Sequence, residues 1–406
     1  MQVVIFEDYL AGELRPVTLA RPTFAISLCG TNLYNLVKLK GLRVSYILRK
    51  YLEEISIQEF PCSKKITEKS LLFLNGALLP LFSILEKILN KTREGKPFLA
   101  QTDSRVSTAF FPDIDFNLSK FNERSITNFL LSQDYEFWEE RFPLINYPFE
   151  IIKYNKDFFK QNTERLKEGY EEKVPGVFTG SNVKIHPTVC MDTEEGRIII
   201  DEGTTIGPFV YLKGPLYIGK NCKVIERTSI KEMSHIGHHC KVGGEVECSI
   251  IEPYSNKQHH GFLGHSWVGS WVNMGAGTSN SDLKNTYGEV TIEYQGRRIP
   301  TGMQFLGCII GDYSKTAINT SIFTGKIIGV ASYVYGFVTT NVPSFCNYAR
   351  SFGQVTEHYL PAVVRTQKRM FERRDVEQKR VHIKLLEDIY EITRDERIMS
   401  TEAFSF

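Results

Sequence analysis

Residues 206–241 spell IGPFVYLKGPLYIGKNCKVIERTSIKEMSHIGHHCK, a series of six-residue steps that open on an aliphatic residue. In such a repeat each step makes one short strand and a tight corner, so three steps close a triangular coil of about 18 residues. The aliphatic residue points inward, and stacked coils bury a column that no single coil could bury. The steps resume at Val268, Met274, Ile310, Thr316 and Ile328. The sequence therefore predicts a β-helix over residues 177–345.

The segments on either side have a different pattern. In residues 1–118 the short aliphatic runs QVVIF, SYILR and SLLFLNG alternate with helical patterns such as LPLFSILEKILNKTRE, which favours an α/β domain with a mostly parallel sheet. Residues 119–176 have helical spacing and are expected to be a linker. Residues 346–406 form a C-terminal extension, in which an amphipathic helix is predicted from about Pro361 to Ile398. We expect it to pack on the β-helix; a membrane or partner helix is the alternative.

Composition narrows the function classes. The chain has 406 residues, 42% of them hydrophobic, so two or more folded domains are expected. Its 49 Lys and Arg against 47 Asp and Glu give a net charge of +2, which argues against a nucleic-acid partner. The eight cysteines include no CxxC pair, so free thiols and a cytoplasmic location are expected. No secretory signal is recognisable, and Asn75 and Pro80 break the longest apolar stretch, so no membrane partner is expected.

The repeats are interrupted by the stretch SNKQHHGFLGHSWVGSWVNMGAGTSNSDLKNTYG, residues 255–288. It contains His259 and His260, then Asn273, then the small-residue run 275–278. A scaffold has no need of paired histidines at such a point, so this is the candidate catalytic stretch.

The pattern His259, Phe262-Leu263-Gly264, then Asn273 and Gly-Ala-Gly-Thr resembles the acetyltransferase half of the bifunctional UDP-N-acetylglucosamine diphosphorylase/glucosamine-1-phosphate N-acetyltransferase family. The resemblance implies a left-handed β-helix and an acetyl-CoA-dependent N-acetyltransferase. It implies that His259 is the general base, a role suited to neutral imidazole, with His260 as the alternative, and that Asn273 holds the acceptor sugar. The CoA contacts it implies are Ala276, Gly277, Tyr335 and Gly336.

Several positions depart from that family. Phe262 stands where the family has a tyrosine, and Lys213 stands where it has a sugar-binding arginine. Glu226 stands at about the position of the family's phosphate-binding lysine, with Arg227 beside it. Lys284 can supply a cation from the following loop. Lys213, Arg227 and Lys284 are therefore the candidate substrate contacts, and the acceptor need not be glucosamine 1-phosphate.

The first domain resembles sugar-1-phosphate nucleotidyltransferases, which are Rossmann-like. AGELRPVTLARPT, residues 11–23, follows the frame GTRLRPLTLTRPK, but Glu13, Thr23 and Ala77 replace residues that bind phosphate and magnesium. The nucleotide-binding candidates are Gly12, Arg15, Arg21, Asn75 and Gly76. A divergent bacterial branch of the bifunctional family is similar over nearly the whole chain, including the segment YPFEIIKYNKDF. Mg²⁺ is implied if this domain is active; the alternative is a degenerate, structural domain.

Two further alternatives stay open. Six histidines, His235, His238, His239, His259, His260 and His265, lie close in sequence, which allows a zinc hydratase of the gamma-carbonic-anhydrase kind, although no metal ligand is assigned. A non-catalytic scaffold is the other. The favoured hypothesis is a sugar-nucleotide biosynthesis enzyme that acetylates an amino-sugar 1-phosphate and carries a uridylyltransferase domain. The resemblance also implies a homotrimer.

Overall fold

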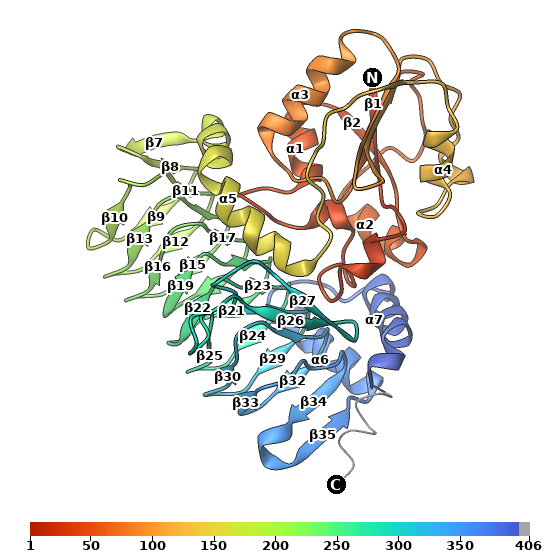
Figure 1. Ribbon diagram of the computed structural model, residues 1–406. Helices are drawn as coiled ribbons and strands as arrows, with labels where there is room; N and C mark the ends of the chain where they lie inside the picture. The colour runs from red at the N-terminus through yellow and green to blue at the C-terminus, as the bar shows by residue number, and fades with distance from the viewer. Residues whose placement is uncertain (398–406) are drawn as a thin grey trace. The chain divides into compact units, whose positions relative to one another are not determined.

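The computed structural model describes residues 1–397, and the chain divides into two compact units, Met1–Tyr147 and Pro148–Phe406 (Figure 1). The four-segment division expected from the sequence stays a prediction. The eight cysteines are all free thiols, as expected. Among the described residues, no helix is long and apolar enough to cross a membrane.

The first unit is a mixed α/β domain. Its six-stranded sheet has the order β2-β1-β3-β5-β4-β6, in which β1, β2 and β3 are parallel and β5 is antiparallel to both of its neighbours. Strands β1 and β3 are buried along their whole length, which explains why both are continuous apolar runs. The strands are β1 (Gln2–Phe6), β2 (Arg43–Ile47), β3 (Leu71–Asn75), β4 (Phe98–Thr102), β5 (Arg105–Phe111) and β6 (Glu136–Phe137).

Short helices flank this sheet. Figure 1 shows α1 (Leu33–Leu39) and α3 (Phe82–Thr92) on one side of the strands and α4 (Ile126–Leu131) on the other, and α2 (Glu53–Glu59) follows β2. Helix α3 buries Phe82, Ile84, Leu85 and Ile88, a spacing of three to four residues that places them on one face. The predicted α/β class is confirmed.

The second unit begins with helix α5 (Pro148–Leu166) and continues as a β-helix with three faces. The first face contains β8 (Val177–Thr179), β11 (Ile198–Ile200), β14 (Leu216–Ile218), β17 (Ser234–Ile236), β20 (Ile250–Ile251), β23 (Trp267–Val268), β28 (Cys308–Ile310) and β31 (Lys326–Ile328), with β7 (Glu171–Val174) at its edge. The second face contains β9 (Lys184–Ile185), β12 (Thr205–Ile206), β15 (Lys223–Val224), β18 (Lys241–Val242), β21 (Asn256–Lys257), β24 (Asn273–Met274), β29 (Lys315–Thr316), β32 (Tyr333–Val334), β34 (Cys346–Ala349) and β35 (Gln354–Glu357). The third face contains β10 (Cys190–Asp192), β13 (Tyr211–Lys213), β16 (Ser229–Ile230), β19 (Glu245–Glu247) and β22 (Phe262–Gly264), followed by β25 (Ser279–Asn280), β30 (Ser321–Ile322) and β33 (Phe337–Val338).

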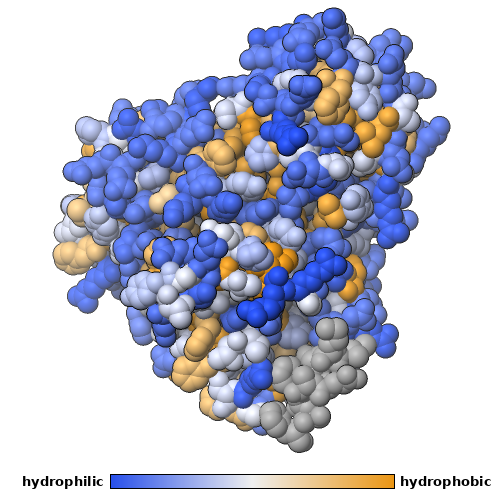
Figure 2. Space-filling view, in the orientation of Figure 1, coloured by the Kyte–Doolittle hydropathy of each residue, from blue (hydrophilic) through white to orange (hydrophobic). Residues whose placement is uncertain are grey.

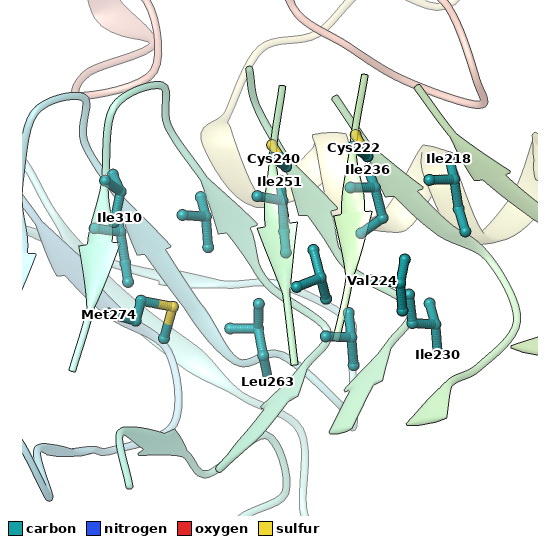
Figure 3. Close-up of a cluster of buried hydrophobic side chains, with 14 of the residues drawn as sticks. Ile218, Cys222, Val224, Ile230, Ile236, Cys240, Ile251, Leu263, Met274 and Ile310 are labelled. Carbon is teal, nitrogen blue, oxygen red and sulfur yellow. The ribbon is translucent and has the colours of Figure 1, made fainter. Parts of the chain in front are cut away.

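The strand register confirms the predicted coil. Ile198 pairs with Leu216 and Leu216 with Ser234, each a step of 18 residues. Figure 3 shows the aliphatic side chains that these coils turn inward, among them Ile218, Val224, Ile236, Leu263 and Ile310, all buried. The β-helix is therefore confirmed, while its left-handed sense stays a prediction.

The expected break at residues 255–288 is mostly regular structure. Strands β21 to β25 continue the coils through Asn280, and the true insertion follows, because Trp267 pairs with Ile309 only after a step of 42 residues. The inserted segment carries the hairpin of β26 (Thr291–Tyr294) and β27 (Arg297–Pro300). His259, Asn273 and Ala276 thus lie on the β-helix itself.

The C-terminal extension differs from the single amphipathic helix that the sequence predicts. Instead of one helix from 361 to 398 there are two, α6 (Leu360–Glu372) and α7 (Arg380–Ile392), and Ile398 lies outside the described residues. Between them, Asp375 has a φ of 55°, in the left-handed region that an α-helix does not contain. The expected packing on the β-helix is confirmed, because the ring of Phe371 in α6 lies 4.3 Å from that of Trp271.

Candidate active site of the β-helix

The corners between the second and third faces carry the candidate catalytic residues. Six of these corners have four residues each, and the four that concern the site lie at 225–228, 258–261, 275–278 and 317–320, between consecutive strands of the two faces. Asn256 pairs with Asn273 across consecutive coils, so His259 and Ala276 take the same, second position of neighbouring corners. His260 takes the third position, and its carbonyl accepts a 3.0 Å hydrogen bond from the amide of Gly277.

A pocket of about 560 Å³, which we call the basic pocket, opens beside these corners. His259, Asn273 and Ala276 line it, together with the end of helix α6 and the outer side of the second face. His260 is not among its lining residues. The structure therefore brings three of the predicted catalytic and CoA-binding residues to one cavity.

Basic side chains give the basic pocket a positive charge. Lys241, Lys315, Arg373 and Arg374 line it, and none of its described lining residues is a carboxylate. Burial, then Arg374 and Arg373, lower the pKa of Lys241. Burial and the neighbouring Arg373 lower the pKa of Arg374, although nearby Cys240 opposes the shift. The positive charge of their neighbours therefore disfavours the charged forms of Lys241 and Arg374, and an anion bound beside them would relieve that repulsion.

Hydrogen bonds hold two of these cations in place. Arg374 donates a hydrogen bond of 2.5 Å to Oδ1 of Asn256. Lys315 donates one of 2.9 Å to the carbonyl of Tyr313, and its ammonium lies 4.9 Å from the centre of the Tyr333 ring. Burial lowers the pKa of Lys315 to about 7.

His259 is exposed to the basic pocket, and its ring has no hydrogen bond to another part of residues 1–397. No carboxylate orients this imidazole, in contrast to His265, whose Nδ1 lies 2.9 Å from Oδ2 of Asp282. The amide group of Asn273 is likewise exposed, with a weak 3.4 Å hydrogen bond from Asn256. Both side chains are available to a bound substrate.

Two of the candidate residues of the first unit, Asn75 and Gly76, lie at the carboxyl edge of its parallel strands. Asn75, at the end of β3, donates 2.9 Å to Oδ2 of Asp8, which follows β1. The amide of Gly76 donates to the carbonyl of Phe6, and a Cβ at Gly76 would lie 2.3 Å from Oγ1 of Thr23. Nε of Arg15 donates 3.3 Å to the carbonyl of Gly12.

Two buried ion pairs fill this edge. Glu7 pairs with Arg49 at 2.9 Å, and Asp8 pairs with Arg105 at 2.8 Å. Glu7 also accepts from the amide of Thr23, and the guanidinium of Arg49 donates to the carbonyl of Arg21. Burial alone would lower the pKa of Arg49, but the Glu7 carboxylate outweighs it and the pKa is raised. These two arginines are therefore neutralised by carboxylates of the chain itself.

The N-terminal part of the chain is similar to proteins of known families. Residues 3–171 match the family model for sugar nucleotidyl transferase. A bifunctional sugar-1-phosphate nucleotidylyltransferase/acetyltransferase of Sulfurisphaera tokodaii is 32% identical over 153 residues, which cover 36% of this chain and 37% of that protein. Residues 3–171 are therefore similar to sugar nucleotidyltransferases, and a β-helix of hexapeptide repeats follows them.

Other relatives are more distant in sequence. The bifunctional protein GlmU of Bartonella quintana is 24% identical over 288 residues, 68% of this chain and 56% of that protein. The chain therefore spans about a third to a half of the length of these two relatives. Among solved structures, the UDP-N-acetylglucosamine acyltransferase of Francisella novicida is similar with 13% identity and a TM-score of 0.23, over 54% of this chain and 79% of that one.

The remaining predicted residues of the β-helix lie away from the basic pocket. Lys213, on the third face, pairs with Glu195 at 3.1 Å and Glu232 at 3.4 Å, and the hydrogen bond that its ammonium donates to Glu195 is the main reason that its pKa is raised. Lys284 donates to the carbonyl of Glu289 within the inserted segment. Both cations already have partners within the chain.

The other three lie on the same series of corners, at a distance along the β-helix. Arg227 belongs to the corner 225–228, two coils before that of His259. Tyr335 and Gly336 form the short corner between β32 and β33, two coils after Ala276. Neighbouring strands lie about 4.8 Å apart. Along the β-helix axis, Arg227 is therefore roughly 10 Å from His259, and Tyr335 and Gly336 are roughly 10 Å from Ala276.

Metal ligation finds little support in the β-helix. Across residues 1–397, no three His, Cys, Asp or Glu side chains are grouped so that they can hold a metal ion. His238 and His239 form a pair with their Nδ1 atoms 2.9 Å apart, while His235 is buried, which lowers its pKa to about 3. The six clustered histidines thus divide among several positions of the fold.

The sequence did not reveal the cations of the basic pocket. Lys241 and Lys315 lie in one outward-facing column of the second face. The sequence signal for this column is the lysine that begins several strands of that face. Arg373 and Arg374 fall within the predicted amphipathic helix, but amphipathic spacing does not indicate which part of the fold its basic residues meet. Only the docking of α6 shows that they belong to the pocket.

Proposed function

We propose that the acyltransferase β-helix transfers the acetyl group of acetyl-CoA to the amine of an amino-sugar 1-phosphate. The observation that carries this proposal is the basic pocket, in which His259, Asn273 and Ala276 lie beside four cations and no carboxylate. Both substrates carry phosphate, which needs cations, and the reaction needs a base beside the attacking amine.

The chemistry assigned to these residues is simple. His259 takes a proton from the amine as the nitrogen attacks the thioester carbonyl, so the C–N bond forms and the C–S bond breaks. The imidazolium then returns the proton to the departing CoA thiolate. Asn273 holds a sugar hydroxyl or the amine by hydrogen bonding, and the cations of the pocket hold phosphate oxygens.

Thiol release from acetyl-CoA tests this function. Glucosamine 1-phosphate and other amino-sugar phosphates serve as acceptors, and the protein is compared with His259→Ala and with His186→Ala, an exposed corner histidine far from the basic pocket. We expect acceptor-dependent release that falls at least 100-fold in His259→Ala and is unchanged in His186→Ala. Release that survives the loss of His259 but not of His260 would move the base to His260.

The family match favours a second function, nucleotidyl transfer to a sugar 1-phosphate, in the first domain. Mg²⁺ normally neutralises charge on the nucleotide phosphates in that chemistry. The carboxylates of this edge do not fit such a site, because Glu7 and Asp8 are each paired with an arginine and Ala77 replaces the expected aspartate. We therefore derive no step through the metal.

Nucleotide binding separates an active domain from a degenerate one. UTP at 100 times its Kd would stabilise the domain by about 2.7 kcal/mol. A thermal shift with UTP that requires Mg²⁺ would support transfer, and the absence of any shift would favour a structural domain. The acetylation assay then reports on the β-helix alone.

We also propose that the β-helix assembles as a homotrimer. Ile318, Phe323, Tyr335, Phe337 and Phe352 are exposed large apolar residues on its last coils, and Figure 2 shows apolar side chains interrupting the hydrophilic surface near β30 and β33. A cluster of this kind is typical of a protein contact. Light scattering should give three times the mass of the chain, and Phe337→Asp should lower it.

A further inference from the structure

Lys257 interrupts the hydrophobic column inside the β-helix. On the second face the inward positions are held by Val224, Val242, Lys257 and Met274 on four consecutive strands. Lys257 is only 2% exposed, and within residues 1–397 it has no ion pair. A charged residue in such a column is costly unless its hydrogen bonds are satisfied.

The ammonium of Lys257 is satisfied by two backbone carbonyls of neighbouring corners. It donates 2.9 Å to the carbonyl of Gly243 and 3.1 Å to the carbonyl of His259. The second bond reaches, from inside the β-helix, the corner that presents His259 to the basic pocket.

Other corners on this edge use threonine for the same purpose. Thr228 and Thr320 hold the fourth position of their corners, are buried, and donate to the carbonyl of the first corner residue, Ile225 at 2.5 Å and Ala317 at 2.9 Å. Thr278 also donates to the Ala317 carbonyl. These hydroxyls tie the corner backbone from within.

The corner of His259 cannot use a threonine. Its fourth residue is Gly261, with a φ of 126°, and a Cβ there would lie 2.1 Å from the carbonyl oxygen of Thr278. The preceding corner is shortened to Gly243 and Gly244, and a Cβ at Gly244 would lie 2.8 Å from Nζ of Lys257. Because these positions are glycines, there is space for the Lys257 side chain. Its ammonium takes the place of the threonine hydroxyl as the hydrogen-bond donor to the corner backbone.

We propose that Lys257 is a positioning residue for acyl transfer, whose buried ammonium fixes the corner 258–261 and with it the imidazole of His259. The inference rests on the proposed acetyltransferase function. Burial also lowers the pKa of Lys257 to about 8, against the opposing effect of Glu245, so the ammonium is held there at a cost to its charged form.

The substitution Lys257→Met separates this role from a purely structural one. Methionine restores an apolar column like that at Met274 and removes a charge whose burial is costly, while it leaves the carbonyls of Gly243 and His259 without this donor. The control is Lys223→Met, which removes an exposed lysine from the same face.

Two measurements are made on the full chain. Hydrogen exchange of backbone amides in residues 258–261 should become at least tenfold faster in Lys257→Met, and exchange in 225–228, the corner tied by Thr228, should stay within twofold. The kcat of acetyl transfer should fall ten- to hundredfold, with the KM for acetyl-CoA within twofold and a cooperative unfolding transition that shows the variant to be folded at the assay temperature. Lys223→Met should match the unaltered protein in every readout.

Other results would contradict either the positioning role of Lys257 or the proposed acetyltransferase function. Unchanged exchange at 258–261 would overturn the positioning role, and so would faster exchange with an unchanged kcat. If the unaltered protein transfers no acetyl group, the proposed function fails, and the exchange rates alone decide whether Lys257 holds the corner. If Lys257→Met does not fold, Lys257→Gln, which keeps an N–H donor of shorter reach, takes its place, and exchange equal to that of the unaltered protein would overturn the role.

Discussion

Arg374, just beyond helix α6, donates a 2.5 Å hydrogen bond to Oδ1 of Asn256 on strand β21. Asn256 pairs in register with Asn273 on the next coil, so this bond fixes a guanidinium one coil away from a predicted substrate contact. The C-terminal extension therefore contributes directly to the basic pocket.

Arg374→Ala should weaken the binding of a phosphate-bearing substrate. A hydrogen bond to a charged group contributes about 1.5–3 kcal/mol, so we expect KM to rise roughly tenfold or more while kcat changes little. Steady-state kinetics at low and high salt measures this, because the effect should shrink as salt screens the pocket. The control is Arg380→Ala, which removes an exposed arginine paired with Glu387; an equal rise in KM there would contradict a specific role for Arg374.

Lys315 should make stability depend on pH. Burial lowers its pKa to about 7 in the folded protein, against about 10.4 in the unfolded chain. Between these values the unfolded state binds the proton and the folded state does not, so stability rises with pH above about 7. We expect a gain of about 1.5 kcal/mol from pH 7 to 8.5, lost in Lys315→Met. Urea unfolding at both pH values measures it, and an equal gain in the variant would refute the assignment.

Asp8→Asn should strongly destabilise the first domain. The change leaves the buried guanidinium of Arg105 without its carboxylate, and breaking a buried ion pair costs about 3–5 kcal/mol. Denaturant unfolding followed by a probe in the first unit measures the loss. Asp113→Asn, which removes one partner of the exposed pair with Lys69, should have no measurable effect; equal effects of the two changes would show that the Asp8 pair contributes little.

The coils could be predicted because their signal is local. An inward aliphatic residue every six positions is imposed by each coil separately, as the 18-residue register from Ile198 to Leu216 confirms. The contribution of Arg373 and Arg374 could not be predicted, because amphipathic spacing shows that a helix face is buried but not what covers it. Lys213 shows the converse limit: its place in a motif suggested sugar binding, whereas Glu195 and Glu232 on nearby coils already neutralise it.

Phe371→Ala should release the end of α6 from the β-helix. The Phe371 ring is 2% exposed and lies 4.3 Å from that of Trp271, which stacks in turn on Tyr254 at 4.4 Å. Truncating a buried phenylalanine costs about 3–5 kcal/mol, and here most of that loss falls on the docking of one helix. Arg373 and Arg374 follow directly in sequence, so their guanidinium groups should leave the basic pocket.

The kinetic signature of Phe371→Ala should therefore resemble that of Arg374→Ala, with a raised KM for acetyl-CoA or the acceptor and a nearly unchanged kcat. Far-ultraviolet circular dichroism should show that the β-helix remains folded. Tyr359→Ala, which removes a 69% exposed ring just before α6, is the matched control. A double variant of Phe371 and Arg374 should show little additional loss, because both changes remove the same cation; fully additive losses would mean that the ring and the guanidinium act independently and that docking of α6 does not place Arg374.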